Sequence, residues 1–482
     1  MIHRTSRRRC RRGSGGKADI PNSFAYVALF GWPVACVVLF ILLPVEAAAI
    51  WSIVAGYLLL PSGLHVDITL VPSIDKTAVA AVSTLLLCWM KGTHAPPPRQ
   101  SWWLYLLGLA FVLAPIFTSF GNSYELQTAG ASIPGFYLPD AFKLAARNLI
   151  ILAPLYVGAR FLCTNEARAL LLRAIVVAAL VYSLPMLVEI RISPQLHRLV
   201  YGYFPHSFAQ QIRDGGYRPV VFLEHGLQVA LFASMAVIAA LVATRAKWRI
   251  LHVPAGWVAA YLSVILVLCK TLGALIYAAV LAPVILFTGP RSWTKVACFL
   301  LLTVCAYPAL RTSGLIPVQR IAGAANSVSG DRALSFLSRV QNEDLLLAKA
   351  NQKPLFGWGT WGRNRIYDTE TGRDLSVTDG TWIIQYGMFG WLGYLSLFGL
   401  FAVGAIRAAR AVGSQMKSEN IILGGLSLVL AANVIDLLPN SDLTPLTFLL
   451  AGSIASAAPE KSARRSARRR ISGSGAAAVV PQ

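Results

Sequence analysis

The sequence predicts an all-α polytopic membrane protein with about 12 transmembrane helices and a large external loop between late spans. Of the 482 residues, 56% are hydrophobic and only 13% are charged, and the mean hydropathy is +0.59, as in proteins that cross a membrane many times. Apolar runs of spanning length recur along the chain. Lys and Arg gather in alternate connections between these runs, which predicts that those connections face the cytoplasm.

The first apolar run, residues 24–60, is too long for one straight span and contains Pro44. Counting it as two spans would place a basic N-terminus outside. We therefore expect one span followed by an interfacial or re-entrant piece, which gives 12 spans with both termini cytoplasmic; 13 spans is the alternative. The other predicted spans cover residues 74–90, 102–120, 141–160, 167–190, 220–243, 250–269, 272–287, 294–310, 382–405, 421–438 and 444–457.

These spans divide the chain into five regions. Residues 24–310 form the first part of the membrane domain, 311–381 the large external loop and 382–457 the C-terminal spans. Residues 1–23 and 458–482 are tails that carry many of the basic residues behind the formal net charge of +22. We expect both tails to lie near anionic lipid on the cytoplasmic side. Nucleic-acid binding is not expected, because neither tail has a domain to orient it.

The large external loop begins with a helical pattern and continues with a turn. Residues 334–349 have the apolar spacing of an amphipathic helix, which Pro354 would end. Glycines then alternate with Trp358 and Trp361 over residues 357–362, so the backbone can turn tightly while two rings remain available for stacking. The same glycines match the pattern G-x-G-x-x-G. Because no strand precedes them and no apolar helix opens from them, we interpret the run as a structural turn and not as a dinucleotide site.

Arginines in the connections predicted to be external are informative, because Lys and Arg are disfavoured there. The first group stands beside Glu224 and His225, where the chain re-enters the membrane, and consists of Arg213 and Arg218. The second group lies in the large loop among carboxylates and consists of Arg332, Arg339, Arg363, Arg365 and Arg373. Two structural alternatives stay open. Glu224 and His225 can pair with an arginine to hold the helix, and Arg365 and Arg373 can form surface ion pairs with nearby aspartates.

The arginine fork holds phosphate in a bidentate manner and stays charged, so two arginine groups outside the membrane suit a diphosphate ligand. No nucleotide supply exists on that side, and a lipid-linked diphosphate is the natural activated donor there. The aromatic rings of Trp358 and Trp361 can stack on sugars. The seven cysteines lie in apolar runs, at their edges or in the first tail, and we expect no metal centre and no cofactor.

In the second half of the chain, several motifs resemble the O-antigen ligase and O-antigen polymerase superfamily. They are the Arg218-Pro219 pair before a span, the loop arginine Arg339, the sequence PLFGWG at 354–359 and the sequence GMFGWLG at 387–393. The resemblance implies about 12 spans in the bacterial inner membrane and a large periplasmic loop whose arginines bind a diphosphate. It also implies metal-independent glycan transfer from undecaprenyl diphosphate. Partners would be the undecaprenyl-diphosphate-linked glycan and membrane lipids, together with a chain-length regulator or flippase, and no nucleic acid.

The ligase branch of that superfamily carries a histidine in the large loop, near the following span, where this chain has Asp379. The departure favours a polymerase of O-antigen or exopolysaccharide repeats over a ligase that transfers polymer to another acceptor. An acceptor hydroxyl would attack the anomeric carbon of the donor, and Glu224, His225 and Asp379 are the candidate bases. A multi-span carrier of lipid-linked oligosaccharide is the alternative from another class. We find no convincing internal repeat of the kind that many carriers have.

Overall fold

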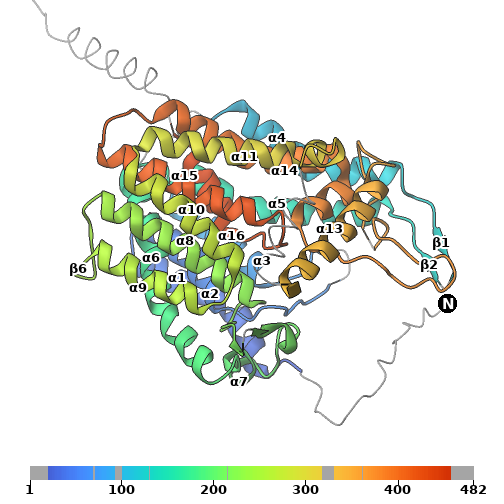
Figure 1. Ribbon diagram of the computed structural model, residues 1–482, viewed down its shortest axis with the longest axis horizontal. Coiled ribbons are helices and arrows are strands. Elements are labelled where there is room, and N and C mark those ends of the chain that lie inside the picture. The colour runs from blue at the N-terminus through green and yellow to red at the C-terminus, as the bar shows by residue number, and fades with distance from the viewer. Residues whose placement is uncertain are drawn as a thin grey trace, which may run out of the picture.

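A computed structural model describes residues 20–68, 71–92, 100–129, 131–213, 215–316, 330–360 and 362–457 of the chain. Eight helices in this part are long and apolar enough to cross a membrane, and four shorter apolar helices accompany them. The chain is therefore an all-α polytopic membrane protein, as the hydropathy predicts (Figure 1). The expected count of 12 spans is not confirmed.

The helices have the following bounds in chain order: α1 Ser23–Leu42, α2 Val45–Leu59, α3 Lys76–Lys91, α4 Trp102–Phe120, α5 Leu138–Phe161, α6 Asn165–Arg191, α7 Leu196–Tyr201, α8 Gly226–Arg245, α9 Ala255–Leu268, α10 Leu272–Phe287, α11 Pro290–Thr312, α13 Gly330–Ala350, α14 Thr381–Ala411, α15 Ser418–Asp436 and α16 Pro445–Ala455. A short 3-10 helix, η1, covers Phe208–Gln211. Three antiparallel two-stranded hairpins pair β1 (Leu126–Thr128) with β2 (Ala131–Ile133), β3 (Ile212–Arg213) with β4 (Gly216–Tyr217), and β5 (Arg249–Ile250) with β6 (Val253–Pro254).

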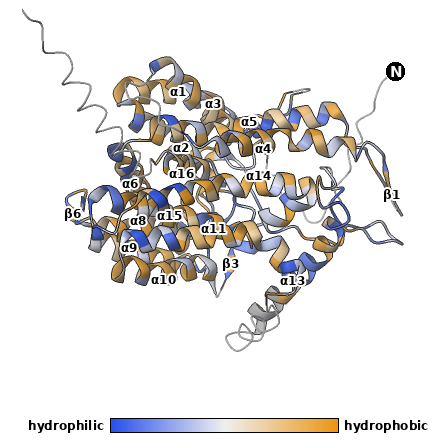
Figure 2. Ribbon diagram, turned by 90° about the horizontal axis from the view of Figure 1, so that it is seen from above, coloured by the Kyte–Doolittle hydropathy of each residue, from blue (hydrophilic) through white to orange (hydrophobic). Residues whose placement is uncertain are grey.

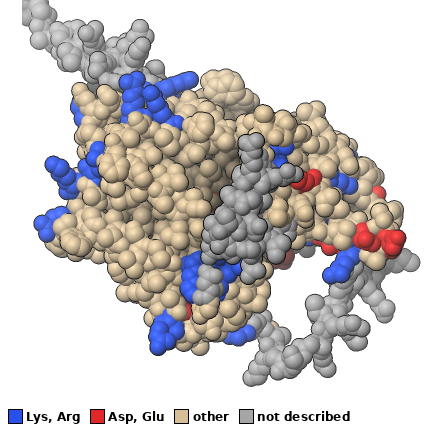
Figure 3. Space-filling view, viewed as in Figure 1, with Lys and Arg blue, Asp and Glu red and all other residues tan. Residues whose placement is uncertain are grey.

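The long helices form a bundle with two different ends. The helix α13 and the hairpin β1–β2 lie on the side of the molecule opposite β6 (Figure 1). We call the end that carries α13, β1–β2, α7 and β3–β4 the loop end, and the end that carries β5–β6 the hairpin end. Hydrophobic residues run along the helices, and hydrophilic residues are concentrated towards their ends and in α13 (Figure 2). Basic side chains stand out at the hairpin end, and acidic ones gather beside β1–β2 (Figure 3).

The stretch 24–60 contains two helices, of which α1 is one of the eight candidate spans and α2 is one of the shorter apolar helices. The backbone turns at Leu43 and Pro44, and α2 packs back along α1. The indole of Trp32 donates a hydrogen bond to the carbonyl of Ser52 across this pair. Gly56 allows the close approach, because a Cβ there would lie 2.9 Å from the Ala80 side chain and 3.0 Å from the Trp32 ring.

The described chain begins and ends at opposite ends of the bundle. Asn22 caps α1 and bonds to the carbonyls of Val200 and Tyr201 on α7, which places it at the loop end. Ala457 follows α16 and accepts a hydrogen bond from Arg407 at the hairpin end. The cytoplasmic position of both termini stays a prediction. The two basic tails fall outside the described residues, apart from residues 20–23.

Close helix packing positions the last helices of the chain. A Cβ at Gly452 of α16 would meet the Leu155 carbonyl oxygen at 2.0 Å, and a Cβ at Gly158 of α5 would meet that of Leu449 at 2.3 Å. The two backbones can touch only because both residues lack a side chain, which is the usual basis of close contact between helices in membranes. This contact fixes α16 and, through it, the connection 437–444 at the loop end.

The two motifs PLFGWG and GMFGWLG pack against each other through backbone hydrogen bonds. Gly390 interrupts α14 with φ 60° and ψ −158°, which frees backbone groups on both sides of the kink. The segment 354–359 lies in this gap, so that a Cβ on Gly390 would meet the Leu355 backbone at 2.4 Å. Four hydrogen bonds satisfy the freed groups: the amides of Trp391, Leu392, Trp358 and Gly359 donate to the carbonyls of Pro354, Leu355, Gly387 and Met388, respectively.

Candidate functional site

The segment 218–225, between β4 and α8, is held by a buried carboxylate. One oxygen of Glu189, on α6, accepts hydrogen bonds from the amides of Val220 and Val221, both at 2.7 Å. The other oxygen accepts from the amide of Leu196 at 2.9 Å. Val221 adopts φ 53°, a conformation that is costly for a β-branched residue and persists only where its surroundings enforce it. Glu189 supplies that enforcement.

The same segment is fixed at its next residue. The Phe222 amide donates to the hydroxyl of Tyr182 at 3.0 Å, and its carbonyl accepts from the Ser62 hydroxyl at 2.8 Å. Lys76 donates in turn to Ser62. His197 holds the other side of this region, because its ring accepts from the Ser62 amide and bonds the Tyr203 carbonyl. A rigid backbone therefore leads into α8.

This backbone places Arg218 beside the start of α8. A Cβ at Gly226 would lie 2.8 Å from the Cβ of Arg218, and Arg218 is 9% exposed. The guanidinium donates to the carbonyl of Lys270 through Nε at 3.4 Å and Nη2 at 3.2 Å. Arg213 is exposed, and its carbonyl accepts from the Lys270 ammonium at 3.1 Å. Lys270 thus joins the two predicted arginines of the first group.

Glu224 and His225 precede α8 and are not inside its apolar run. His225 is the N-cap, and its Nδ1 accepts from the Leu227 amide at 3.0 Å. With that lone pair engaged, the neutral ring carries its proton on Nε2, which lies 3.2 Å from the Gln210 side-chain oxygen. Glu224 is exposed, and its charge acts on Lys76 and Asp442.

The second arginine group contributes Arg339. It lies on α13, the amphipathic helix that the sequence predicts, which packs on α14. Its Nε forms an ion pair with Asp379 at 3.3 Å, and both side chains are partly exposed, at 42% and 37%. Asp379 is not the N-cap of α14, because Gly380 holds that position and no side chain caps it. The sequence leaves open that Asp379 only caps the helix that follows it, and the structure does not support this alternative.

Glu343 stands one turn after Arg339 on α13. The indole of Trp382 lies 3.4 Å from its carboxylate. Burial raises the pKa of Glu343 to about 7, although the hydrogen bond from Trp382 and the charges of Arg311 and Arg339 oppose the rise. Arg311 is paired with the neighbouring Asp344 at 2.8 Å. This carboxyl group can therefore exchange a proton near neutral pH.

The two arginine groups converge on His225. Burial is the largest cause that lowers the pKa of this histidine to about 4, and the charges of His206, Arg218, Arg339 and Arg213 add to it. The rings of His206 and His225 are 5.3 Å apart between centroids. The charges of cations from the segment before α8 and from α13 thus both reach His225. A shared binding site for Arg213, Arg218 and Arg339 stays a prediction.

Other predicted site residues lie elsewhere or are not described. Arg363 is fully buried and donates to the carbonyls of Trp358, Tyr124 and Pro134, so it ties the large loop to β1–β2. Trp358 is 7% exposed, with the ammonium groups of Lys349 and Lys353 3.9 Å and 4.6 Å from its ring centroid. Its ring is therefore already in contact with cations and is not open for stacking on a sugar. The Arg332 side chain and Trp361 lie outside the described residues.

The structural alternatives for the loop are confirmed in part. Arg365 and Asp374 form a surface ion pair at 2.7 Å, as expected for this half of the loop. Gly357, Gly359 and Gly362 all have positive φ, at 67°, 82° and 79°. The G-x-G-x-x-G run is therefore a structural turn, and the strands of the described residues form only short antiparallel hairpins.

Sequence reasoning missed a pair of buried carboxylates at the loop end. Asp436 ends α15 and Asp442 follows it, with exposures of 4% and 8%. Each has one buried oxygen without a hydrogen-bond partner among the described residues. Asp442 accepts from Gln228 at 3.0 Å, and burial raises its pKa to about 6, with Glu224 adding to the rise. The sequence contained one indication of this pair, because Asp436 and Asp442 stand at the ends of apolar runs, where ionisable residues are often functional.

Comparison with known proteins does not indicate what this site binds. No family model matches the chain, and no curated protein matches its sequence. Within the described ranges, no group of three or more His, Cys, Asp or Glu side chains is arranged to hold a metal ion.

Proposed function

We propose that the protein is a metal-independent glycosyltransferase that polymerises undecaprenyl-diphosphate-linked repeats for O-antigen or exopolysaccharide synthesis. One observation carries the proposal: the guanidinium groups of Arg218, held at the Lys270 carbonyl, and of Arg339, paired with Asp379, come from segments far apart in the chain. The charges of both help to lower the pKa of His225. Two guanidinium groups suit a diphosphate, because each can hold phosphate oxygens in a bidentate manner and stays charged. The sequence motifs that resemble the superfamily point the same way.

In this proposal the acceptor sugar hydroxyl attacks the anomeric carbon of the donor glycan. The bond from that carbon to the diphosphate oxygen breaks, and undecaprenyl diphosphate leaves with the electron pair. Arg218 and Arg339 stabilise the negative charge that develops on the leaving group. The donor diphosphate replaces Asp379 at Arg339, which is 3.3 Å away in the ion pair, and so releases this carboxylate beside the reacting centre.

A carboxylate accepts the hydroxyl proton. Asp379 is our first candidate because it adjoins Arg339. Asp442 is the second candidate, because a base works best when its pKa, here about 6, lies near the working pH. Glu224 is exposed and lies close enough to Asp442 to raise its pKa. His225 does not enter the proposal as a base, because its Nδ1 caps α8.

We infer that the loop end faces the periplasm and that the protein has 13 spans, α1 and α2 each crossing once. In a cysteine-free background, single cysteines at positions 20 and 213 are expected to react with an impermeant thiol reagent from outside. A cysteine at position 410 is expected to stay unlabelled in intact cells. All three positions are exposed. Labelling of 213 without 20 would restore the 12-span arrangement with a cytoplasmic N-terminus.

A carrier of lipid-linked oligosaccharide is the second candidate, and the buried pair Asp436 and Asp442 favours it. Ionisable groups buried among spans often relay protons in transporters. A ligase is the nearer alternative, although the large loop contains no histidine.

The test is polymer formation by purified protein from a synthetic undecaprenyl-diphosphate-linked repeat, with no other enzyme present. We expect a ladder of longer lipid-linked glycans and equimolar release of undecaprenyl diphosphate. Arg339→Ala is expected to abolish the ladder, and Arg373→Ala, at an exposed position of the same loop, is the matched control. Transbilayer movement of the repeat without any lengthening would replace the transferase by the carrier.

A further inference from the structure

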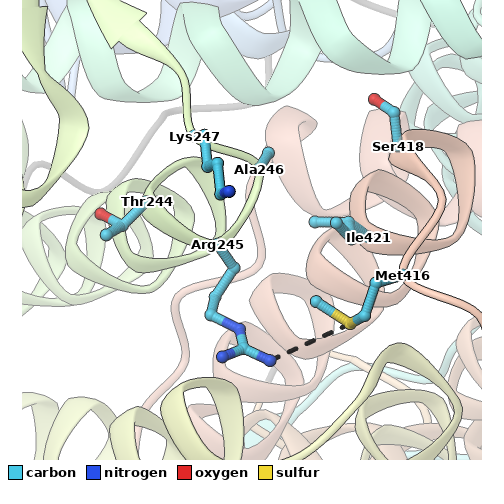
Figure 4. Close-up of a pocket in the computed structure, with 7 residues that line it drawn as sticks. All are labelled: Thr244, Arg245, Ala246, Lys247, Met416, Ser418 and Ile421. Atoms are coloured by element: carbon cyan, nitrogen blue, oxygen red, sulfur yellow. Dashed lines mark hydrogen bonds between the residues drawn. The ribbon is translucent and has the colours of Figure 1, made fainter.

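A cavity of about 530 Å³ opens at the hairpin end, and none of the arginines discussed above lines it. Figure 4 shows the residues that line it. It lies between the C-terminal end of α8 and the start of α15. Its lining combines two cations, two hydroxyl groups and three apolar side chains and contains no carboxylate: Thr244, Arg245, Ala246, Lys247, Met416, Ser418 and Ile421. An open cavity with this charge balance favours an anion.

Arg245 is fixed in the wall of this cavity. Its guanidinium donates to the carbonyls of Leu286 at 2.9 Å and Thr288 at 3.2 Å, and one nitrogen lies 3.9 Å from the sulfur of Met416. Carbonyl oxygens carry no net charge, and none of the ion pairs between described residues involves Arg245. Its Nε is buried and has no hydrogen-bond partner among the described residues. The positive charge is therefore held in place and not neutralised.

Lys247 brings a second cation at some conformational cost. It has φ 56° at the end of α8, in the position after a helix where glycine is usual because a side chain is strained there. The Trp248 amide bonds back to the Ala243 carbonyl at 2.9 Å and completes the helix end. A strained residue that persists where glycine would fit is a reason to suspect a role for its side chain.

The start of α15 adds to the preference for an anion. Ser418 is the first residue of this helix, and Lys417 before it provides no side-chain cap. The first amide groups of a helix have no partners within the helix and carry a partial positive charge. Ser418 is one of the residues that line the cavity, and its hydroxyl group points away from Arg245 (Figure 4).

A neighbouring cavity of about 430 Å³ shares Ser418 but has a different charge balance. Its lining includes Glu166 and Glu419 as well as Arg173 and Lys417. Carboxylates and cations there offset one another, so the first cavity is the one suited to an anion. Beside it, Leu286 and Phe287 at the end of α10 are 38% and 83% exposed, which offers apolar surface next to the carbonyl that holds Arg245.

We propose that this cavity binds the phosphodiester headgroup of an anionic phospholipid from the leaflet at the hairpin end. Arg245 and Lys247 contact the phosphate, Ser418 and the α15 amides donate hydrogen bonds to it, and an acyl chain lies along Leu286 and Phe287. A basic pocket between membrane helices is a recurrent way to recognise such headgroups. The site joins α8, α10 and α15, and its occupancy does not depend on the reaction proposed for the loop end.

The test measures lipid binding to the purified full-length protein by native mass spectrometry and by thermal stabilisation, with phosphatidylglycerol, phosphatidylcholine and inorganic phosphate as separate probes. We expect phosphatidylglycerol to bind at least tenfold more tightly than either of the others. Equal binding of phosphatidylcholine would overturn the proposal. Inorganic phosphate that displaces the lipid at comparable concentration would overturn the assignment to a lipid.

Three variants locate the binding. Arg245→Gln removes the fixed charge, and Ser418→Glu adds a negative charge while leaving the Arg245 hydrogen bonds intact. Lys247→Gly relieves the strain, so the protein is expected to unfold at the same or a higher temperature while its affinity for phosphatidylglycerol falls by at least threefold. Arg249→Gln is the matched control, because Arg249 is exposed on β5 and bonds only to the nearby His252 carbonyl among the described contacts. Unchanged affinity in Lys247→Gly and Ser418→Glu would refute the site.

Discussion

Replacing Glu189 by glutamine tests whether the segment 218–225 must be held rigidly. The carboxylate of Glu189 accepts three backbone hydrogen bonds, two from the segment and one from Leu196. Glutamine has nearly the same size but only one acceptor oxygen. If that oxygen keeps the bonds from Val220 and Val221, the amide NH₂ of the new side chain faces the Leu196 amide, donor against donor.

The expected cost follows from the bonds changed. A hydrogen bond to a charged group contributes about 1.5–3 kcal/mol and a neutral one about 0.5–1.5 kcal/mol. One bond is lost and two become neutral, which sums to about 4 kcal/mol. The neutral side chain is easier to bury than a carboxylate, and this offsets part of the loss. We expect a net destabilisation of about 3 kcal/mol, concentrated where Val221 is held at φ 53°.

Two measurements follow on purified protein: thermal unfolding in detergent, and initial rates of polymer formation. We expect Glu189→Gln to lower both the unfolding temperature and the rate, and to increase hydrogen exchange at residues 220–223. Glu166→Gln, at the exposed start of the same helix, is the matched control and is expected to change little. Wild-type exchange and rate in Glu189→Gln would show that the segment does not depend on this carboxylate.

Three further predictions concern the loop end. Arg339→Ala is expected to lower polymer formation, because it removes about 3–4 kcal/mol of charge stabilisation. Arg339→Lys should restore the rate only partly, because lysine cannot hold a phosphate in a bidentate manner. An effect of Arg339→Ala no larger than that of Arg373→Ala would contradict the proposal that Arg339 binds the diphosphate. Because burial raises the pKa of Asp442 from 3.8 to about 6, its protonated form stabilises the fold below pH 4, and this contribution is lost as the pH rises through 6. Between pH 4 and pH 6 the free energy of unfolding should fall by about 3 kcal/mol in the wild type, and Asp442→Asn should remove this pH dependence. The same pH dependence of unfolding in Asp442→Asn and wild type would contradict the raised pKa of Asp442. Gly390→Ala should destabilise the protein strongly, since its Cβ would meet the Leu355 backbone at 2.4 Å; normal unfolding would show that the kink is not needed.

The membrane helices could be predicted from the sequence because burial in a bilayer leaves a local signal. The predicted spans 102–120 and 272–287 coincide with α4 and α10, and the amphipathic pattern at 334–349 falls within α13. Each of these elements is determined by the composition of one continuous stretch. The start of α8 was placed too early, because 220–225 is apolar but its amides are held by Glu189 and Tyr182 instead of by a helix.

The remaining features depend on contacts between distant residues, which no local pattern contains. Arg363 looks like Arg339 in the sequence, but three carbonyls from two segments hold it in the interior. The packing of α2 on α1 is a second example, because the sequence of residues 24–60 shows a long apolar run and a proline but not the contacts between the two helices. In the structure, the bonds between Asn22 and α7 fix the start of α1 at the loop end.

The two arginines of the proposed site are held in opposite ways, and this difference suits a ligand that must bind and then leave. Arg218 is 9% exposed and already bonded to a carbonyl, so its charge has lost most of its hydration before any ligand arrives. Arg339 is 42% exposed and paired with an aspartate that is also partly exposed, a type of ion pair that contributes little to stability and is easily exchanged. A diphosphate would therefore bind to Arg218, which is fixed in position, and to Arg339, which would exchange its carboxylate partner for a phosphate. The carboxylate set free by that exchange is Asp379, so donor binding itself would expose the base, and the apo enzyme would keep it neutralised.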